Sequence, residues 1–305
     1  MNIQMPSPQS AHRTPLRTAR DLERWRTSLR GDEASRAERD DAQLPLIALV
    51  PTMGYLHEGH LSLIRRARTL ARHVVVSIFV NPTQFNDPQD FERYPRDEEG
   101  DLRAAFSAGA DAVFLPTPDV IYPQGAQTRV RVGPLADSLC GATRPGHFEG
   151  VCTVVMALFQ LTQCNVSVFG EKDYQQLTII RQMARDLHLP IEVIGAPTLR
   201  EEDGLAMSSR NARLSPDERQ RASSIYRGLD AARSAWRQKI RDVERLRTLA
   251  LSDLPAQARV DYIEVCDLHT LTPLQGDVSA YPGVVIAIAV FIGGVRLIDN
   301  LVFED

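Results

Sequence analysis

The sequence contains little cysteine and no long apolar run. Its four cysteines, Cys140, Cys152, Cys164 and Cys266, show no CxxC spacing. Buried reduced thiols are therefore expected rather than a disulfide framework or a zinc site, as is typical of the cytoplasm. No stretch reaches the roughly 18 apolar residues of a membrane span, and residues 1–15 lack the apolar segment of a secretory signal. These absences predict a cytoplasmic protein without a membrane partner.

An excess of positive charge is also missing. The chain of 305 residues has 35 Lys and Arg against 39 Asp and Glu, a net charge of -4. General nucleic-acid binders usually present a strongly basic face, so no nucleic-acid partner is expected. With 43% hydrophobic and 24% charged residues, the chain can form two domains or one large one.

The most informative stretch begins with the apolar run 46–50, which predicts a buried parallel strand ended by Pro51 and Gly54. From Leu61 onward, apolar residues recur at helical spacing. His57 and His60 lie in the intervening turn, where the first backbone N–H groups of a helix form an anion site. Two histidines three apart more often cap or pack than catalyse, so this motif alone indicates phosphate binding only weakly.

Further strands are predicted in alternation with helices, which indicates a doubly wound, Rossmann-like parallel α/β sheet. The remaining chain favours a smaller C-terminal α+β domain with two helices broken near 239–241, a strand, and a hairpin turning at Gly293 and Gly294. We expect domains at 1–197 and 198–305, a mobile tail at 1–14, and a solvated connection or helix extension at 30–43. The expected strands are 46–50, 73–80, 112–116, 165–169, 191–194, 260–266, 284–291 and 295–303, and the main expected helices are 18–29, 151–163 and 175–187.

Polar clusters follow several of these strands, at the edge where open parallel sheets bind ligands. The amides of Asn81 and Gln84 can hold a carboxylate or hydroxyl without adding charge. Lys172 offers a mobile charge for phosphate, and Asp173 a hard oxygen for a metal or a ribose hydroxyl. Asp101 is the first candidate among the acids of 87–102 for approaching a magnesium-bound phosphate.

A hydrophilic loop then places two hydroxyls beside an arginine. Arg210 can fork onto phosphate oxygens while Ser208 and Ser209 donate to them. The alternative is a loop that merely enters a helix. However, Ser215 to Glu218 already forms a complete capping box with proline at the first helical position, which leaves the two earlier serines freer for another role.

Five ordered motifs, PTMGYLHEGH, VSIFVNPTQF, RPGHFEG, FGEKDYQQL and DGLAMSSRN, resemble those of the pantoate–β-alanine ligase family from about Leu44 to Leu214. This family belongs to the nucleotidyltransferase superfamily, whose members carry an HxGH motif and a KMSKS-type loop. In this sequence MSSR, residues 207–210, stands in place of the KMSKS-type loop and is called the MSSR loop. The resemblance implies synthesis of pantothenate from pantoate, β-alanine and ATP through a pantoyl-adenylate, with release of AMP and pyrophosphate. It further implies magnesium and a cytoplasmic homodimer.

The resemblance also implies roles for individual residues. His60 and His57 would support the reacting α-phosphate, with Lys172 and Arg210 as further catalytic groups. Gln84 and Gln176 would hold pantoate or β-alanine, with Asn81 nearby. Thr83 and Cys152 stand where many relatives have a methionine and a small aliphatic residue. The resemblance therefore does not determine how the substrates pack near these two positions. The implied ATP-binding residues are Met53, Gly54, Tyr55, Leu56, His57, Glu58, Gly59, His60, Gly170, Glu171, Lys172, Asp173, Leu199 (through its backbone), Met207, Ser208, Ser209 and Arg210.

Two other functions remain open from the sequence. A related cytidylyltransferase would share HxGH but not the pair Gln84 and Gln176, and it would use CTP. A nucleotide-sensing module would bind ATP without releasing AMP.

Overall fold

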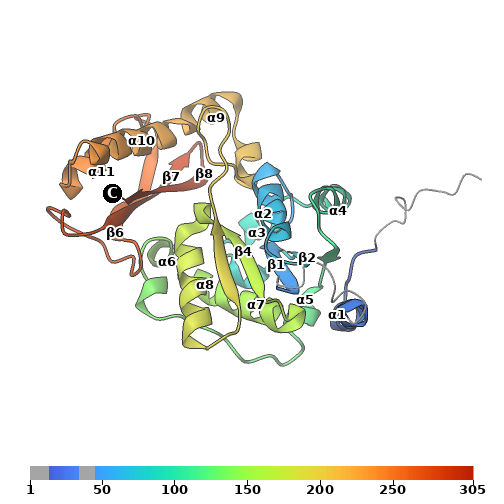
Figure 1. Cartoon of the computed structure of the whole chain (residues 1–305). Helices are drawn as coiled ribbons and strands as arrows, with labels where there is room; N and C mark the ends of the chain where they lie inside the picture. Colours follow the sequence, from blue (N-terminus) through green and yellow to red (C-terminus); the bar gives the residue numbers. More distant parts are fainter. Residues whose placement is uncertain (1–13, 34–44, 305) are drawn as a thin grey trace, which may run out of the picture.

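Five parallel strands form the central sheet of the computed structural model, which describes residues 14–33 and 45–304 (Figure 1). Their order, β3-β2-β1-β4-β5, places β1 and β4 side by side at the point where the winding direction reverses. The predicted doubly wound fold is therefore confirmed. The strands are β1 (Ile47–Thr52), β2 (His73–Ile78), β3 (Ala112–Phe114), β4 (Val166–Gly170) and β5 (Glu192–Ala196).

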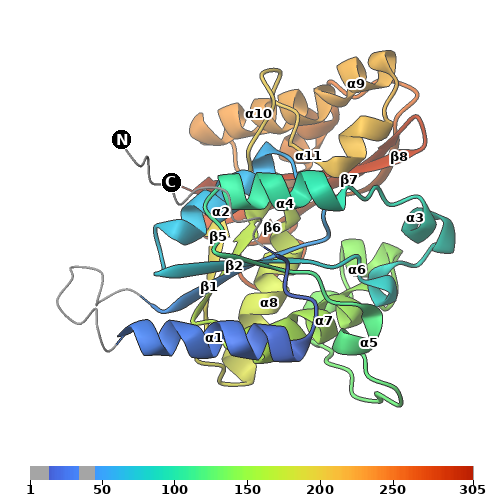
Figure 2. The same cartoon turned by 90° about the vertical axis from the view of Figure 1, so that its right-hand side faces the viewer.

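Both faces of this sheet are buried, because successive side chains of a strand point to opposite sides. Ala48 and Val50 enter one hydrophobic core, while Ile47 and Leu49 enter the other. Figure 2 shows the two helical layers on either side. One face is covered by α2 (Glu58–Arg68) and α4 (Glu98–Ser107), the other by α1 (Ala19–Glu33), α7 (His147–Thr162) and α8 (Tyr174–Asp186). Short helices α3 (Pro88–Glu92), α5 (Pro118–Ile121) and α6 (Cys140–Thr143) lie in the connections.

The C-terminal part has its own hydrophobic core between helices and an antiparallel sheet of order β6-β7-β8. Gly293 and Gly294 join β7 to β8 with φ angles of 55° and 83°, which a tight two-residue hairpin turn requires. The predicted α+β character and the glycine hairpin are confirmed. The elements are α9 (Pro216–Ala222), α10 (Ser224–Arg237), α11 (Val243–Leu251), β6 (Arg259–Asp267), β7 (Gly283–Ile292) and β8 (Val295–Glu304).

Three local expectations were wrong. Pro51 does not end β1. The strand pairs with β4 only at Ala48 and Leu49, but its pairing with β2 continues to Thr52. The helix after the histidine motif begins at Glu58, so His60 lies in its first turn. The chain from Pro216 forms three helices instead of two. The first two are separated at Ser223, whose hydroxyl donates to the carbonyl of Gln220.

Other expectations concern the tail, the connection and the surface. Only Thr14 of the tail is described, and α1 extends to Glu33, whereas 34–43 lies outside the described residues.

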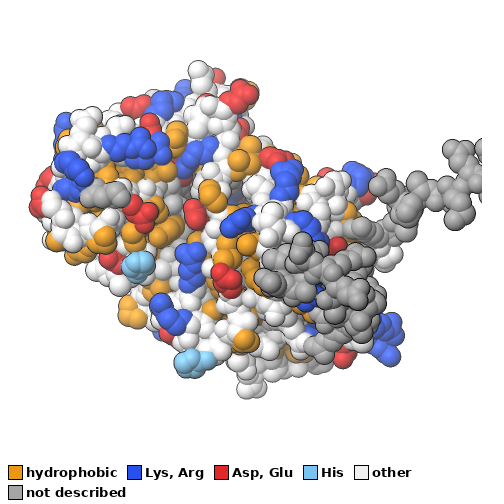
Figure 3. Space-filling view, in the orientation of Figure 1, with side chains coloured by type: hydrophobic (Ala, Val, Ile, Leu, Met, Phe, Trp, Pro, Cys, Tyr) orange, Lys and Arg blue, Asp and Glu red, His pale blue; other side chains and the backbone are white. Residues whose placement is uncertain are grey.

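All four cysteines are free and buried. Among the described residues, no helix combines the length and apolar character that crossing a bilayer requires. On the face shown in Figure 3, Lys and Arg side chains are interspersed with Asp and Glu.

Candidate functional site

A left-handed turn connects β1 to α2. Gly54 and Tyr55 have φ angles of 82° and 52°, a conformation that costs a non-glycine residue about 1–2 kcal/mol. The buried carboxylate of Asp101, on α4, accepts the backbone N–H groups of Tyr55 (2.8 Å) and Leu56 (2.7 Å). Burial raises the pKa of Asp101, although these two bonds act in the opposite direction. Asp101 thus holds the turn that presents His57.

The two histidines pack together, with ring centroids 4.1 Å apart. Nδ1 of His60 accepts the backbone N–H of His57 (3.3 Å), which places the proton of a neutral His60 on Nε2. Burial lowers the pKa of His60 to about 3, with help from His57, and lowers that of His57 to about 4, with help from Lys172. Both rings are therefore neutral at pH 7. The His60 ring caps the start of α2 by accepting the N–H of His57, and both rings can also hydrogen-bond a ligand.

Nδ1 of His57 is buried and has no hydrogen-bond partner among the described residues. Such an atom calls for an explanation, and a bound ligand is one. Gly59 makes room for this ring, because a Cβ at that position would lie 2.9 Å from Cε1 and Nδ1 of His57. The HxGH spacing is thus a packing requirement as well as a motif.

The turn after β2 is organised around Asn81, which is only 1% exposed. Its amide donates to Oε1 of Gln84 (3.1 Å) and to the carbonyl of Gly150 (3.1 Å). Its Oδ1 accepts from Tyr122 (2.7 Å) and Thr83 (2.9 Å). Asn81 therefore orients Gln84, whose own amide nitrogen lies 3.0 Å from the sulfur of Met53.

A second loop, 144–150, supports this turn. Nη2 of Arg144 (3.0 Å) and Nδ1 of His147 (2.7 Å) both contact the backbone carbonyl of Gln84. Nε2 of His147 lies 3.2 Å from Arg144, so His147 is neutral with its proton on Nδ1. Burial lowers the pKa of His147 to about 3. No role for Arg144 or His147 was expected from the sequence, although the RPGHFEG motif contains both.

The MSSR loop is held on the other side of the site. Ser208 accepts the backbone N–H of Arg210 (3.3 Å) and caps a short 3-10 helix, so it is less free than expected. Nη2 of Arg210 pairs with Asp90 at 3.3 Å, and Asp90 also pairs with Arg213 at 2.8 Å. The pKa of Asp90 is lowered because the two guanidinium groups outweigh its partial burial.

A cavity of about 230 Å³ joins these elements. Phe79, Val151, Val154 and Leu158 give it an apolar wall. The predicted site residues that line it are Met53, His57, Gly59, His60, Asn81, Gln84, Gly170, Lys172, Asp173, Gln176, Leu199, Met207, Ser208, Ser209 and Arg210. It is not lined by Gly54, Tyr55, Leu56, Glu58 or Glu171.

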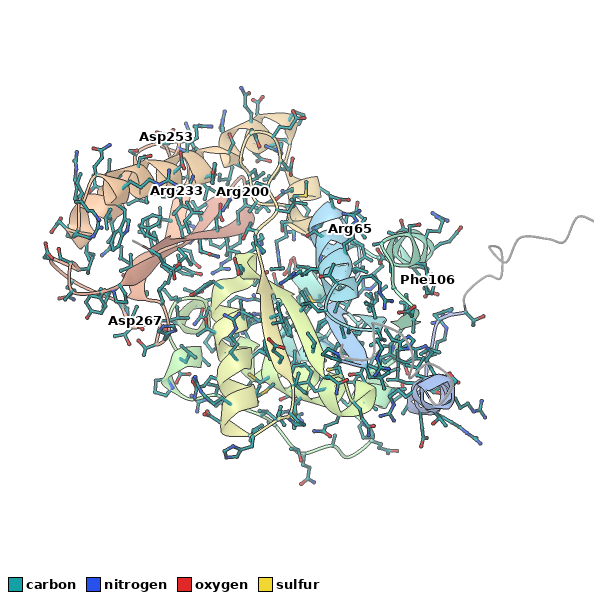
Figure 4. The ribbon with its side chains drawn as sticks, viewed as in Figure 1. Arg65, Phe106, Arg200, Arg233, Asp253 and Asp267 are labelled. Carbon is teal, nitrogen blue, oxygen red and sulfur yellow. The ribbon has the colours of Figure 1, made fainter. Side chains whose placement is uncertain are left out.

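The residues outside the lining have other contacts. Gly54, Tyr55 and Leu56 form the turn described above, and Glu58 pairs with Arg65, which Figure 4 labels on α2. Cys152 is fully buried in the sheet core and does not line the cavity.

An adjacent cavity of about 360 Å³ reaches β8 and Asp261 and Tyr262 near the start of β6. The two cavities share the lining residues Arg144, His147, Lys172, Asp173, Gln176, Ser208 and Arg210. Together they reach the range of about 300–1,000 Å³ that is typical of small-molecule sites.

The structure gives Asp101 a role different from the predicted approach to magnesium, because its two oxygens accept backbone N–H groups away from the cavity lining. Asp173 lines both cavities and is exposed, so its oxygens are accessible. Within the described ranges, no group of three or more His, Cys, Asp and Glu side chains is arranged to hold a metal ion. Magnesium commonly uses one or two carboxylates together with phosphates and water, and the donor set at Asp173 fits that pattern.

The chain matches one family over most of its length. Its model, described as Pantoate-beta-alanine ligase, matches residues 16–302. The pantothenate synthetase of Myxococcus xanthus is 51% identical, with 94% of each chain covered. A pantothenate synthetase structure from Thermus thermophilus has a TM-score of 0.82 at 44% identity, covering 94% of this chain and 98% of that one. A Francisella tularensis ligase structure, complexed with Beta-gamma ATP and Beta-alanine, has a TM-score of 0.73 at 34% identity, with 95% and 97% covered. The chain therefore belongs to the pantoate–β-alanine ligase family.

Proposed function

We propose that this chain condenses (R)-pantoate with β-alanine to form pantothenate, using ATP and releasing AMP and pyrophosphate through a pantoyl-adenylate. The observation that carries this proposal is the single cavity shared by the paired imidazoles, Lys172, the MSSR loop and two glutamines. Similarity to the Francisella tularensis protein supports ATP and β-alanine as substrates.

In the first step the pantoate carboxylate attacks the α-phosphorus of ATP and pyrophosphate leaves. The nucleophile is already ionised, so no serine or cysteine needs activation. Alignment and charge stabilisation then supply most of the rate. Neutral His57 and His60 would hydrogen-bond the α-phosphate, while Lys172 and Arg210 offset the charge of the departing pyrophosphate. Ser208 and Ser209 would donate to phosphate oxygens.

Pantoate itself requires both polar and apolar contacts. The amides of Gln84 and Gln176 can bind its carboxylate and hydroxyls without adding a competing charge. The two methyl groups on its quaternary carbon suit the wall formed by Val151, Val154 and Leu158. Asn81 would act by orienting the amide of Gln84.

In the second step the β-alanine amine attacks the carbonyl of the mixed anhydride, and AMP leaves. Water must be kept from this anhydride, and closure of the loop at 201–211 would serve that purpose. The adjacent cavity offers space for β-alanine beside residues that both cavities share.

The finer predictions belong to the same proposal. Asp173 is the residue that would hold magnesium, which would neutralise part of the phosphate charge when bound. The remaining ATP contacts, including the backbone of Leu199, are those implied by the resemblance. We also propose that the protein is a cytoplasmic homodimer. The proposed domain boundary follows residue 197, just after the end of β5 in sequence.

Exchange of labelled pyrophosphate into ATP tests the first step. It should require pantoate but not β-alanine, and AMP should accumulate only when β-alanine is added. A requirement for both acids would exclude the adenylate route. Efficient replacement of ATP by CTP would favour a cytidylyltransferase, and ATP binding without AMP release would favour a sensor.

A further inference from the structure

Strand β8 carries two consecutive buried polar residues, Asp299 and Asn300, which are 3% and 6% exposed. Both also line the larger cavity. Burial of a carboxylate and an amide is unfavourable unless each is paired, so their partners show what they stabilise.

Asn300 holds the segment that carries Lys172. Its side-chain amide nitrogen donates to the backbone carbonyls of Glu171 (3.0 Å) and Lys172 (2.9 Å). One amide nitrogen has two hydrogens, so these bonds use its full donor capacity. The peptide groups on both sides of the Lys172 α-carbon are thereby attached to β8, which fixes the direction in which this side chain leaves the backbone.

Asp299 holds the base of the MSSR loop. Its two oxygens pair with the guanidinium of Arg200 at 2.7 Å and 2.9 Å, and both side chains are largely buried. Figure 4 shows Arg200 where the chain leaves β5 and meets the antiparallel sheet. Arg200 also donates to the carbonyl of Gly204 (3.0 Å) and stacks on Tyr226, 4.2 Å from the ring centroid.

The loop is closed by backbone bonds that lead directly to the serines. The N–H of Met207 donates to the carbonyl of Leu199 (3.0 Å), and that of Glu201 to the carbonyl of Leu205 (2.9 Å). The backbone position of Met207 is therefore set by the segment that contains Arg200. Ser208 to Arg210 are the next residues in the chain.

We propose that Asp299 and Asn300 are positioning residues that set Lys172 and the MSSR loop relative to each other, and that adenylation depends on this register. Neighbouring residues on one strand hold Lys172 and Arg200, which are 28 positions apart in sequence. The inference rests on the proposed function. It assigns the C-terminal sheet a positioning part in the first chemical step, through Arg200 and the backbone of the Lys172 segment rather than through contact with reacting atoms.

The test compares Asn300→Ala and Asn300→Ser with Asn165→Ala as a matched control. Asn165 likewise makes two bonds to backbone groups, accepting from Leu46 and Ile47 at 3.1 Å each, but at the amino end of β1 away from the cavities. Asn300→Ala should lower the rate of pyrophosphate exchange on the order of tenfold, as expected for the loss of about 1.4 kcal/mol of alignment. Its KM for pantoate should stay within about twofold, because Gln84 is held by Asn81, Arg144 and His147.

Asn300→Ser retains one donor, so its exchange rate should lie between those of Asn300→Ala and the wild type. Asn165→Ala should keep the exchange rate while losing stability to denaturant. Wild-type exchange in Asn300→Ala, or an equal loss in both alanine variants, would overturn the proposal.

Hydrogen exchange in the substrate-free protein separates this inference from the proposed function. Amides of residues 171–174 should lose protection in Asn300→Ala and keep it in Asn165→Ala, whatever reaction the enzyme catalyses. Unchanged protection there would refute the positioning role, whereas absence of pantoate-dependent exchange in the wild type would refute the proposed function alone.

Discussion

The substitution Asp101→Ala separates a structural role for this residue from a metal-binding role. The change leaves the N–H groups of Tyr55 and Leu56 without their acceptor and removes the contact that holds Tyr55 at a φ of 52°. Hydrogen bonds to charged groups contribute about 1.5–3 kcal/mol, and relaxation of the left-handed residue returns about 1–2 kcal/mol. The two bonds together contribute about 3–6 kcal/mol, so after this return we expect the free energy of unfolding to fall by about 1–5 kcal/mol, and the KM for ATP to rise as the turn relaxes.

Chemical denaturation and steady-state kinetics at varied magnesium concentration measure this effect. Asp97→Ala is the control, because Asp97 caps the same helix by accepting the N–H of Gly100 at 3.0 Å. It should cost about 1 kcal/mol of stability and leave the KM for ATP unchanged. An Asp101→Ala variant with unchanged stability, whose half-saturating magnesium concentration rises about tenfold or more, would refute our reasoning and make Asp101 a metal ligand.

Three further predictions concern the charges and packing of the cavity. His57 and His60 should remain neutral from pH 8 to pH 5 in an NMR titration of their imidazole protons, because burial lowers both pKa values to about 4 and 3. Since the unfolded rings bind protons below about pH 6.5, the free energy of unfolding should fall as the pH drops from there toward 4; a titration near 6.5 would contradict this. Gly59→Ala should slow pyrophosphate exchange about tenfold by displacing the His57 ring, without destabilising α2, since alanine favours helices; unchanged exchange would show that the ring position is not critical. Asp90→Asn should lower the KM for ATP about two- to fivefold by releasing Arg210, and a higher KM would instead show that Asp90 positions Arg210.

Local patterns were sufficient for most of the architecture. The β-branched run 73–80 and the apolar run 46–50 became β2 and β1, and the glycine pair at 293–294 became the hairpin turn. Each of these depends on near neighbours in the chain. The convergence of the polar clusters was also predictable, because carboxyl ends of parallel strands share one edge of the sheet.

Long-range polar contacts were not predictable in this way. Asp101 was expected to approach magnesium, yet it holds a turn 45 residues earlier in the chain, at Leu56. Asn81 was expected near pantoate, and its polar atoms are bonded to protein groups that include Gly150. Arg144 and His147 line the cavity and contact the carbonyl of Gln84, although their motif suggested no specific contact. Acidic and amide side chains have many possible partners, and their spacing does not select among them.

The sequence by itself determined most of the strands and main helices, the parallel sheet that brings polar clusters to one edge, and the family to which the motifs belong. Only the tertiary structure decided which polar groups face the cavity and which serve the backbone. It also decided that β8 holds both Lys172 and the MSSR loop. The physical reason is that secondary structure follows from local periodicity, whereas the partner of a buried polar group depends on which distant segment packs against it.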